Sequence, residues 1–503
     1  MNNVILLGTA SGVGKSTLAS GICRYLKKKN LKVAPFKALN ISLNSYVTKE
    51  GDEMGRAQVV QARACGIEAK AIMNPLLLKP CGNNKTQIIL NGKVHSNMDS
   101  YKYKEMCEFF RVEVKKSYEK ISKDFDFIVL EGSGSCAEIN LKNTDIANTY
   151  MAKSVEAPII LVSDIDRGGV FASVLGTIML LDEDERKLLG GVVINKFRGD
   201  KEKFKPAVKQ LEDLIGVKVL GVMPYFNLDI EDEDGVSEKI KNKDSKENNL
   251  DIAVIRLKHM SNFTDFNSFN RVSGVSIRYV KTLDELKNPD IIILPGTKNT
   301  LSDLRELKSN GLFERIKDLV NKDEVVLFGI CGGYQMLGKS IKDPLGIEGD
   351  IEGEEGFNLL GLSTEFNELK TLKHTRGEVV SNHDLMKNSL GKEVIGYEIH
   401  NGESQILDFK NIFIEDENKN ILGLSNKKGN VYGTYIHGLF DSTEFLNSLV
   451  ETFKEKFNKD LLIIEENRSL SYDEYREKQY DELLKLMEEN LDIEALDKIL
   501  GLK

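Results

Sequence analysis

Residues 4–26, VILLGTASGVGKSTLASGICRYL, decide the fold of the first part of this chain. The apolar run Val4–Leu7 predicts a strand, residues 8–14 predict a glycine-rich turn, and a helix is expected to begin at Lys15. A turn of this kind directs backbone N–H groups into one concavity, and the helix adds the positive end of its dipole. The stretch therefore predicts a phosphate-binding loop in an α/β domain.

The residue types in this loop predict how it would bind a nucleotide. Lys15 would reach the β and γ phosphates, and Ser16 would ligate Mg²⁺. The alternative is a glycine-rich turn with a surface lysine, but Gly-Lys-Ser falls at the strand-to-helix junction that a phosphate loop requires. The expected nucleotide-binding residues are Gly8, Thr9, Gly12, Gly14, Lys15, Ser16 and Thr17, joined by Asn195 and Lys196 from a later strand end.

Composition limits the classes of partner and the number of domains. A chain of 503 residues exceeds one ordinary core, so we expect two domains and a tail. The net charge of −9 argues against a nucleic-acid partner. No apolar run approaches the roughly 18 residues that a membrane span needs, so we expect a cytoplasmic protein without a membrane partner. Six cysteines without paired spacing indicate neither a zinc site nor a disulfide framework.

Polar residues follow several apolar strands of the predicted parallel sheet. Lys37 lies where the strand after the first helix would end, which places it beside the phosphate loop. Glu131 follows the buried strand Phe127–Leu130, where its carboxylate is suited to Mg²⁺. The alternative for Glu131 is a cap on the glycine turn that follows it.

Two loops hold weaker candidates for contact with a substrate or a metal. For each of these residues, a solvated loop or a helix cap is an equally good interpretation. They are Asn40, Asn44, Asp52, Glu53, Glu138 and Asp145.

Charge and hydrophobic patterning divide the chain. An alternation of strands and helices over residues 1–230 predicts the first domain. The next segment, 231–249, is almost wholly polar and is predicted to be a linker. A second α/β pattern occupies 250–450. Residues 451–503 predict a helical tail with a solvated face. We expect this tail either to pack on the second domain or to mediate self-association, which leaves a homo-oligomer open.

The second domain contains a candidate nucleophile. A strand over Val325–Phe328 leads into GICGG and then a helix, so Cys331 occupies a sharp strand-to-helix turn whose flanking glycines permit strain. The helix N-terminus at such a turn stabilises a thiolate. A buried structural thiol is the alternative, which suits Cys23 or Cys65 better.

A cysteine that performs acyl transfer also needs a base and an oxyanion hole. His437 follows an apolar strand far downstream and is the preferred base, with His400 as the second choice. Either could instead be a core histidine. The backbone N–H groups of Gly296, Thr297 and Gly332 are the expected oxyanion donors.

The order and spacing of many short stretches resemble the cobyric acid synthase family, glutamine-dependent amidases of cobalamin biosynthesis. The resemblance spans nearly the whole chain. It rests on GTASGVGKS, PFKALNISLNS, GDEMGRAQ, MNPLLLKP, EGSGSCAEINL, SDIDRGGVFAS, NKFRGD, LPGTKNT, GICGGYQMLG, YEIHNG and YIHGLF.

The resemblance implies a synthetase domain of the dethiobiotin-synthetase type followed by a flavodoxin-like class I glutamine amidotransferase domain. It implies ATP, Mg²⁺ and glutamine as reactants, and amidation of the b, d, e and g carboxylates of adenosylcobyrinic acid a,c-diamide. It makes Cys331 the nucleophile, His437 its base, Glu131 an Mg²⁺ ligand and Lys37 a contact to the activated carboxylate.

One departure and two alternatives accompany this resemblance. Class I amidotransferases usually have a glutamate two residues after the histidine, where this chain has Leu439, so a dyad is expected and the group that orients the imidazole is open. The nearer alternative is cobyrinic acid a,c-diamide synthase, which shares the architecture. The other is a non-catalytic ATP-switch protein, which the contexts of Cys331 and His437 disfavour.

Overall fold

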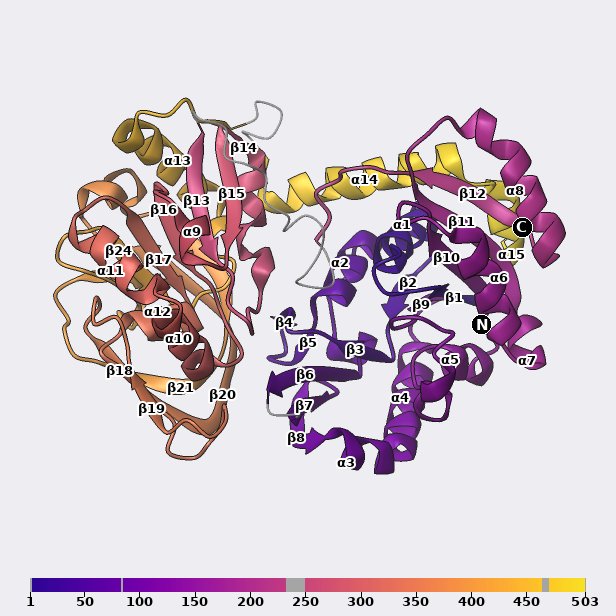
Figure 1. The fold of residues 1–503 in the computed structure, drawn as a ribbon, viewed down its shortest axis with the longest axis horizontal. Helices are drawn as coiled ribbons and strands as arrows, with labels where there is room; N and C mark the ends of the chain where they lie inside the picture. The colour runs from indigo at the N-terminus through magenta and orange to yellow at the C-terminus, as the bar shows by residue number, and fades with distance from the viewer. Residues whose placement is uncertain (1, 83–84, 232–248, 464–469, 503) are drawn as a thin grey trace.

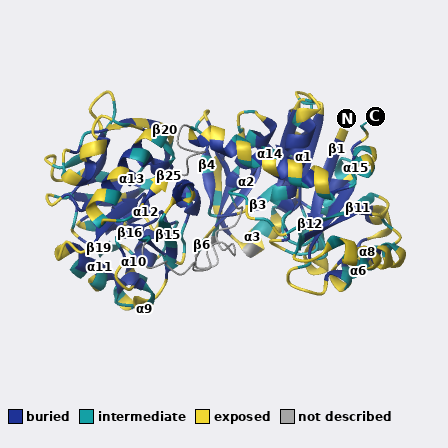
Figure 2. Cartoon of the chain, turned by 90° about the horizontal axis from the view of Figure 1, so that it is seen from above, coloured by how far each residue is buried: buried dark blue, intermediate teal, exposed yellow. Residues whose placement is uncertain are grey.

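The computed structural model describes residues 2–82, 85–231, 249–463 and 470–502, which form two α/β domains side by side (Figure 1). Most of the predicted linker, residues 232–248, lies outside the described residues. In both domains the central parallel strands are buried and the helices that flank them expose one face (Figure 2). Among the described helices, none is long and apolar enough to cross a bilayer.

The first domain is built on a six-stranded parallel sheet, as the alternating pattern predicts. In spatial order its strands are β12 (Val219–Pro224), β11 (Leu189–Phe197), β10 (Ile159–Asp164), β1 (Asn2–Gly8), β9 (Phe127–Glu131) and β2 (Val33–Phe36). Because β1 is central, the loop that follows it opens at the middle of the carboxyl edge, where open α/β sheets bind ligands.

Helices cover both faces of this sheet, and a smaller set of strands lies against the second domain (Figure 1). The helices are α1 (Lys15–Lys28), α2 (Arg56–Cys65), α3 (Ser100–Glu105), α4 (Cys107–Ile121), α5 (Thr149–Ser154), α6 (Val170–Leu180), α7 (Glu183–Arg186) and α8 (Lys201–Ile215). The smaller strands are β3 (Leu39–Ile41), β4 (Ser45–Val47), β5 (Glu53–Gly55), β6 (Leu76–Gly82), β7 (Lys85–Leu90) and β8 (Lys93–Asp99). The sequence predicts one helix over residues 100–121, which the structure divides at Met106.

The second domain has an eleven-stranded mixed sheet. Its parallel part is β15 (Val275–Val280), β13 (Leu250–Ile255), β16 (Ile291–Leu294), β17 (Val326–Ile330) and β24 (Val431–Thr434). The rest is β23 (Ile421–Ser425), β22 (Ile412–Glu415), β20 (Leu362–Val379), β21 (Glu393–Ile406), β18 (Ser340–Lys342) and β19 (Gly353–Glu355). The long β20–β21 hairpin reaches the first domain, where Lys370 pairs with Glu53 at 2.5 Å.

The helical elements of this domain connect or flank its strands. They are the 3₁₀ segments η4 (Phe263–Arg271), η5 (Asp384–Ser389) and η6 (Leu439–Asp441), and the helices α9 (Leu283–Leu286), α10 (Thr300–Ser309), α11 (Leu312–Asn321), α12 (Gly332–Leu337) and α13 (Thr443–Phe457). Helix α13 crosses residue 450, where the sequence places the start of the tail.

The tail is helical as expected. Its last two helices pack on the first domain, whereas the sequence predicts packing on the second domain or self-association. Helices α14 (Tyr472–Asn490) and α15 (Ile493–Ile499) lie on α1 and β12 of the first domain (Figure 1). Leu483 and Met487 are buried in the same core as α1, and Arg24 pairs with Glu477 and Asp481 at 2.7 and 2.9 Å. The apolar face of α14 therefore has its partner within the chain.

Candidate active sites

The loop after β1 has the geometry of a phosphate-binding loop. Gly14 caps α1 with a φ of 99°, which favours glycine, and a Cβ there would lie 2.1 Å from the Asn195 side-chain nitrogen. The Nζ of Lys15 is folded over the loop, 2.8 Å from the carbonyl oxygen of Gly134. The loop thus places a buried ammonium group where phosphates would bind.

Ser16 and Glu131 meet beside this lysine. The Ser16 hydroxyl donates to Oε1 of Glu131 at 2.7 Å, and the carboxylate also accepts from Lys37 at 2.9 Å and from Gln61. Burial opposes the charge of Glu131, but Lys37 and these hydrogen bonds outweigh it and lower the pKa of the carboxyl. Two adjacent oxygen donors next to a phosphate loop fit a hard cation such as Mg²⁺, which takes few protein ligands beside phosphates and water.

Asn195 and Lys196 contact the phosphate loop from the end of β11. The Asn195 side chain donates to the carbonyl of Val13 at 2.8 Å, and Nζ of Lys196 donates to the carbonyl of Gly12 at 2.8 Å. Lys196 also pairs with Asp164 at 2.9 Å. These side chains brace the loop and line the space above it.

Several weaker candidates have structural partners. The carboxylate of Asp145 accepts from the backbone amides of Ala147, Asn148 and Tyr150, so it caps the start of α5. Glu53 is buried between Lys79 and Lys370. Burial raises the pKa of Glu53, but the two ammonium groups outweigh it and lower that pKa strongly.

In the second domain, Cys331 stands on a strained turn between β17 and α12. Its φ of 53° and ψ of −108° are unusual for a residue with a side chain. A Cβ on Gly333 would lie 2.0 Å from the carbonyl oxygen of Leu294, so glycine is required there. The turn therefore has the construction of a nucleophile elbow.

His437 lies beside this cysteine and is oriented by a carboxylate. Nδ1 of His437 lies 2.7 Å from Oδ2 of Asp265, whose other oxygen accepts from the backbone N–H of Gly438 at 3.1 Å. Burial opposes the charge of the imidazole, but Asp265 and Cys331 outweigh it and raise the pKa of His437 to about 10. Cys331, His437 and Asp265 thus have the arrangement that a nucleophile, a base and a group orienting the base require.

The imidazole is also held by a tyrosine that reaches the first domain. The Tyr397 ring stacks on His437 with 5.4 Å between ring centroids. The Tyr397 hydroxyl accepts from Asn262 at 2.7 Å and lies 3.3 Å from the carbonyl oxygen of Ser45. The position of the base is therefore coupled to β4 across the domain boundary.

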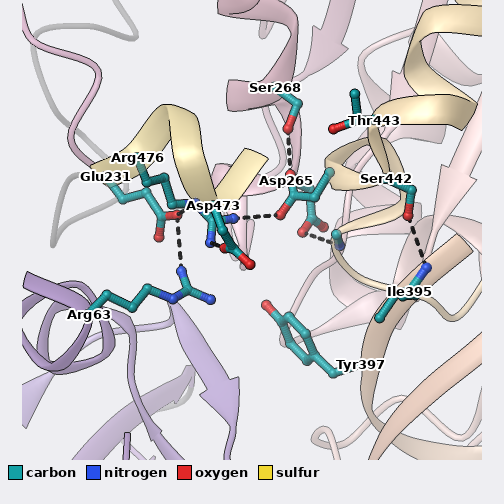
Figure 3. Close-up of polar contacts among 12 residues, drawn as sticks. Arg63, Glu231, Asp265, Ser268, Ile395, Tyr397, Ser442, Thr443, Asp473 and Arg476 are labelled. Carbon is teal, nitrogen blue, oxygen red and sulfur yellow. Dashed lines mark hydrogen bonds and ion pairs between the residues drawn. The ribbon is translucent and has the colours of Figure 1, made fainter. Parts of the chain in front are cut away.

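A buried ionic cluster joins the tail, the first domain and the 3₁₀ segments beside Asp265 (Figure 3). Arg476 of α14 donates to Asp441 at 3.1 Å and pairs with Glu231 at 3.4 Å. Glu231 also pairs with Arg56 at 2.5 Å, and Asp441 accepts from Ser268 of η4. Burial raises the pKa of Asp441 to about 6 although Arg476 opposes this change.

The remaining predicted residues of this domain surround Cys331. The backbone nitrogen of Thr297 lies 3.1 Å from the Cβ position of Gly332, and the Cβ position of Gly296 lies 2.9 Å from His437, so the expected oxyanion donors converge here. His400 stacks on Tyr435 in the wall of the Cys331 pocket.

Two cavities lie near these centres. A cavity of about 1120 Å³ lies between the phosphate loop and the second domain, lined on one side by Lys15 and on the other by Met260. A small pocket at Cys331 is lined by residues from both domains, including Lys79 and Ser261. Met260 lines the large cavity and Ser261 lines the small pocket, so this segment borders both spaces.

Comparisons with known proteins agree with this division. Residues 4–235 match the CobQ/CobB/MinD/ParA nucleotide binding domain, and residues 251–445 match the CobB/CobQ-like glutamine amidotransferase domain. Fold and sites thus define a glutamine amidotransferase joined to a nucleotide-binding synthetase domain.

Curated relatives specify the family. Cobyric acid synthase of Clostridium botulinum strain Alaska E43 is 55% identical over 501 residues, covering 99% of each chain. That of Clostridium perfringens strain SM101 is 54% identical over 498 residues, also covering 99% of each. That of Caldanaerobacter subterraneus is 44% identical over 506 residues, covering 99% of this chain and 98% of its own. The chain belongs to the cobyric acid synthase family of glutamine-hydrolysing ligases.

Sequence reasoning missed Asp265 and Tyr397. Asp265 lies 172 positions before His437, in a segment, NFTDFNSFN, that has no spacing relation to it. Tyr397 lies in the stretch YEIHNG, in which the sequence analysis singles out His400. Tyr397 lies within β21, where its backbone pairs with that of His437, a contact that no sequence spacing indicates.

Proposed function

We propose that this chain uses glutamine and Mg·ATP to amidate the b, d, e and g side-chain carboxylates of adenosylcobyrinic acid a,c-diamide, each through an acyl phosphate. The observation that carries the proposal is the interdomain cavity. It is bounded by a phosphate loop on one side and by the glutaminase domain on the other, and the segment at residues 260–261 borders both this cavity and the Cys331 pocket.

The glutaminase half-reaction follows from the Cys331 geometry. The thiolate attacks the side-chain amide carbon of glutamine, and the oxyanion lies against backbone N–H groups at Thr297 and Gly332. The protonated imidazole of His437 donates its proton to the departing ammonia. The neutral imidazole then takes a proton from water as that water attacks the thioester, which releases glutamate. Asp265 holds the tautomer and stabilises the imidazolium.

In the synthetase half-reaction, a carboxylate of the acceptor attacks the γ-phosphate of ATP. Lys15 and the loop amides hold the phosphates in line. Ser16 and Glu131 would hold Mg²⁺, which neutralises phosphate charge when bound. We assign Lys37 first to the orientation of Glu131, because its ammonium contacts that carboxylate at 2.9 Å, and its contact with the activated carboxylate stays a prediction.

Ammonia then attacks the acyl phosphate, expels phosphate and leaves an amide. Free ammonia is largely protonated near neutral pH and is then no nucleophile. Transfer past the segment at residues 260–263 would keep it neutral, and Asn262 and Ser45 meet there.

The test is a mass spectrum of adenosylcobyrinic acid a,c-diamide after incubation with the enzyme, glutamine and Mg·ATP. Four successive amidations are expected, one for each of the four carboxylates. Cys331→Ala should lose the glutamine-dependent reaction and keep the ammonia-dependent one. Cys107→Ala, at a thiol of the first domain that lines neither cavity, serves as the matched control. Amidation of unamidated cobyrinic acid alone would instead indicate the a,c-diamide synthase reaction, and glutamine hydrolysis would exclude a non-catalytic ATP switch.

A further inference from the structure

We propose that the second domain supplies the binding subsite for the acceptor's non-reacting carboxylates. The subsite consists of Arg256, Lys258 and Lys281, together with Asn44 of the first domain, and its ligand is a polycarboxylate. This inference rests on the proposed function, because it concerns the substrate that shares the cavity with ATP.

The fold places two of these cations together. Arg256 directly follows β13 and Lys281 directly follows β15, and the last residues of these parallel strands, Ile255 and Val280, are paired in register. The backbone N–H of Arg256 donates to the carbonyl of Val280 at 2.7 Å. The two side chains therefore leave the sheet at neighbouring points of its carboxyl edge, and both line the large cavity.

The same edge carries the glutaminase centre. In the sheet order β15, β13, β16, β17, the first two strands end in the cations, β16 leads to Gly296, and β17 leads to Cys331. An acceptor held at the ends of β13 and β15 would thus lie at the same sheet edge as Cys331, where ammonia is released from glutamine. The phosphate loop faces this part of the edge across the cavity.

The charges around the cavity favour an anion. On the phosphate-loop side, Lys196 already pairs with Asp164. On the other side, Arg256, Lys258 and Lys281 are exposed and have no ion pair with any described residue. Among the residues that the structure describes, the acidic side chains that line the cavity are Glu231 and Glu306. Glu231 is neutralised by Arg56, Arg63 and Arg476.

Asn44 provides an independent observation. Its side chain is 2% exposed and lines the cavity, yet neither its amide nitrogen nor its amide oxygen has a hydrogen-bond partner. Buried amide groups without partners are rare and costly. A carboxylate of the acceptor would accept from the nitrogen, and the amide formed in the reaction would donate to the oxygen.

The size of the cavity fits this interpretation. Its volume of about 1120 Å³ lies above the range of about 300–1000 Å³ that is usual for one small ligand. A nucleotide at the phosphate loop leaves room for a large acceptor against the second domain. One carboxylate would react at the loop while others meet the cations, so a single subsite serves successive amidations.

The test uses full-length enzyme with ammonium chloride as the nitrogen donor, saturating Mg·ATP and varied adenosylcobyrinic acid a,c-diamide. The variant R256A/K258A/K281A is compared with K387A/K410A/K427A, which removes the same charge from exposed positions of the second domain away from the cavity. We expect the KM for the acceptor to rise about tenfold or more in the first variant only, from the loss of three charge contacts. The KM for ATP and the glutaminase rate should stay near the wild-type values.

Two further measurements separate binding from folding. The acceptor KM of the wild type should rise with ionic strength, and the cavity variant should lose most of this dependence. Should the triple variant fail to fold, the single variants Arg256→Gln, Lys281→Gln and Asn44→Ala give the same comparison. An acceptor KM equal to that of the control variant, with an unchanged salt dependence, would overturn the subsite. A wild type that does not amidate this acceptor would overturn the proposed function as well, whatever the variants do.

Discussion

Asp265→Asn removes the charge that supports His437 while it keeps the size of the side chain. The pKa of His437 rises from 6.5 to about 10 in the protein, a change that corresponds to about 5 kcal/mol in favour of the imidazolium. Burial acts in the opposite direction, so loss of the Asp265 charge should lower the pKa of His437. The fraction of imidazolium at neutral pH should therefore fall in the variant.

The expected loss in glutaminase kcat/KM is about 10²–10⁴-fold, as for the matching change in serine-protease triads. The assay is glutamate release from glutamine between pH 6 and 10. In the wild type the imidazolium is lost only as the pH rises toward 10. Without the Asp265 charge it should be lost at lower pH, so the alkaline limb of the profile should move to lower pH.

Two controls accompany this variant. Ammonia-dependent amidation should be unchanged, since the synthetase site is separate. Asp251→Asn removes a carboxylate that pairs with Arg278 at the opposite end of β13, and it should leave the glutaminase pH profile as it is. A D265N enzyme with kcat/KM within about threefold of the wild type and the same profile would refute the role of Asp265 as orienting group.

Three other changes test separate parts of the structure. Gly14→Ala should abolish ATP-dependent amidation and spare glutaminase activity. The new side chain would stand at a φ of 99° with its Cβ 2.1 Å from the side chain of Asn195. Unimpaired amidation would contradict the loop geometry. Arg476→Ala leaves the buried carboxylates of Glu231 and Asp441 without this partner. Urea unfolding should therefore show that the free energy of unfolding falls by about 3–5 kcal/mol. An unchanged urea midpoint would show that the cluster does not stabilise the fold. Tyr397→Phe keeps the stack on the imidazole but removes the hydroxyl. Glutaminase activity should fall by about three- to tenfold, while the temperature of unfolding shifts only slightly. Activity equal to the wild type would show that the interdomain hydrogen bond is not needed.

Local patterns made much of this fold predictable. The phosphate loop and the elbow at Cys331 each occupy one short strand–turn–helix stretch, in which glycine positions and strand ends fix the geometry. The parallel arrangement of β1, β9, β10 and β11 follows from alternating strands and helices. These features depend on residues close in sequence, so the sequence alone shows them.

Features that join distant segments were beyond such reasoning. The partner of His437 comes from a 3₁₀ segment, which has neither a strong hydrophobic period nor a spacing rule toward the histidine. The β20–β21 hairpin was not predicted, because its strands are mostly polar where they face the first domain. The packing partner of α14 could not be chosen from the helix pattern, since both domains offer apolar surfaces of similar character.

The position of α14 and α15 has a consequence for how the chain acquires its structure during synthesis. Tyr480, Leu483, Leu484 and Met487 complete the core on the outer side of α1. The first domain to leave the ribosome therefore lacks part of its core until the last residues have been made, long after the second domain has emerged. Until then the side of α1 that packs against α14 is open to solvent. A nascent chain that stalls before residue 472 would thus present this face to chaperones, and arrest at successive lengths should show protease resistance of the first domain rising only when the final helices are released.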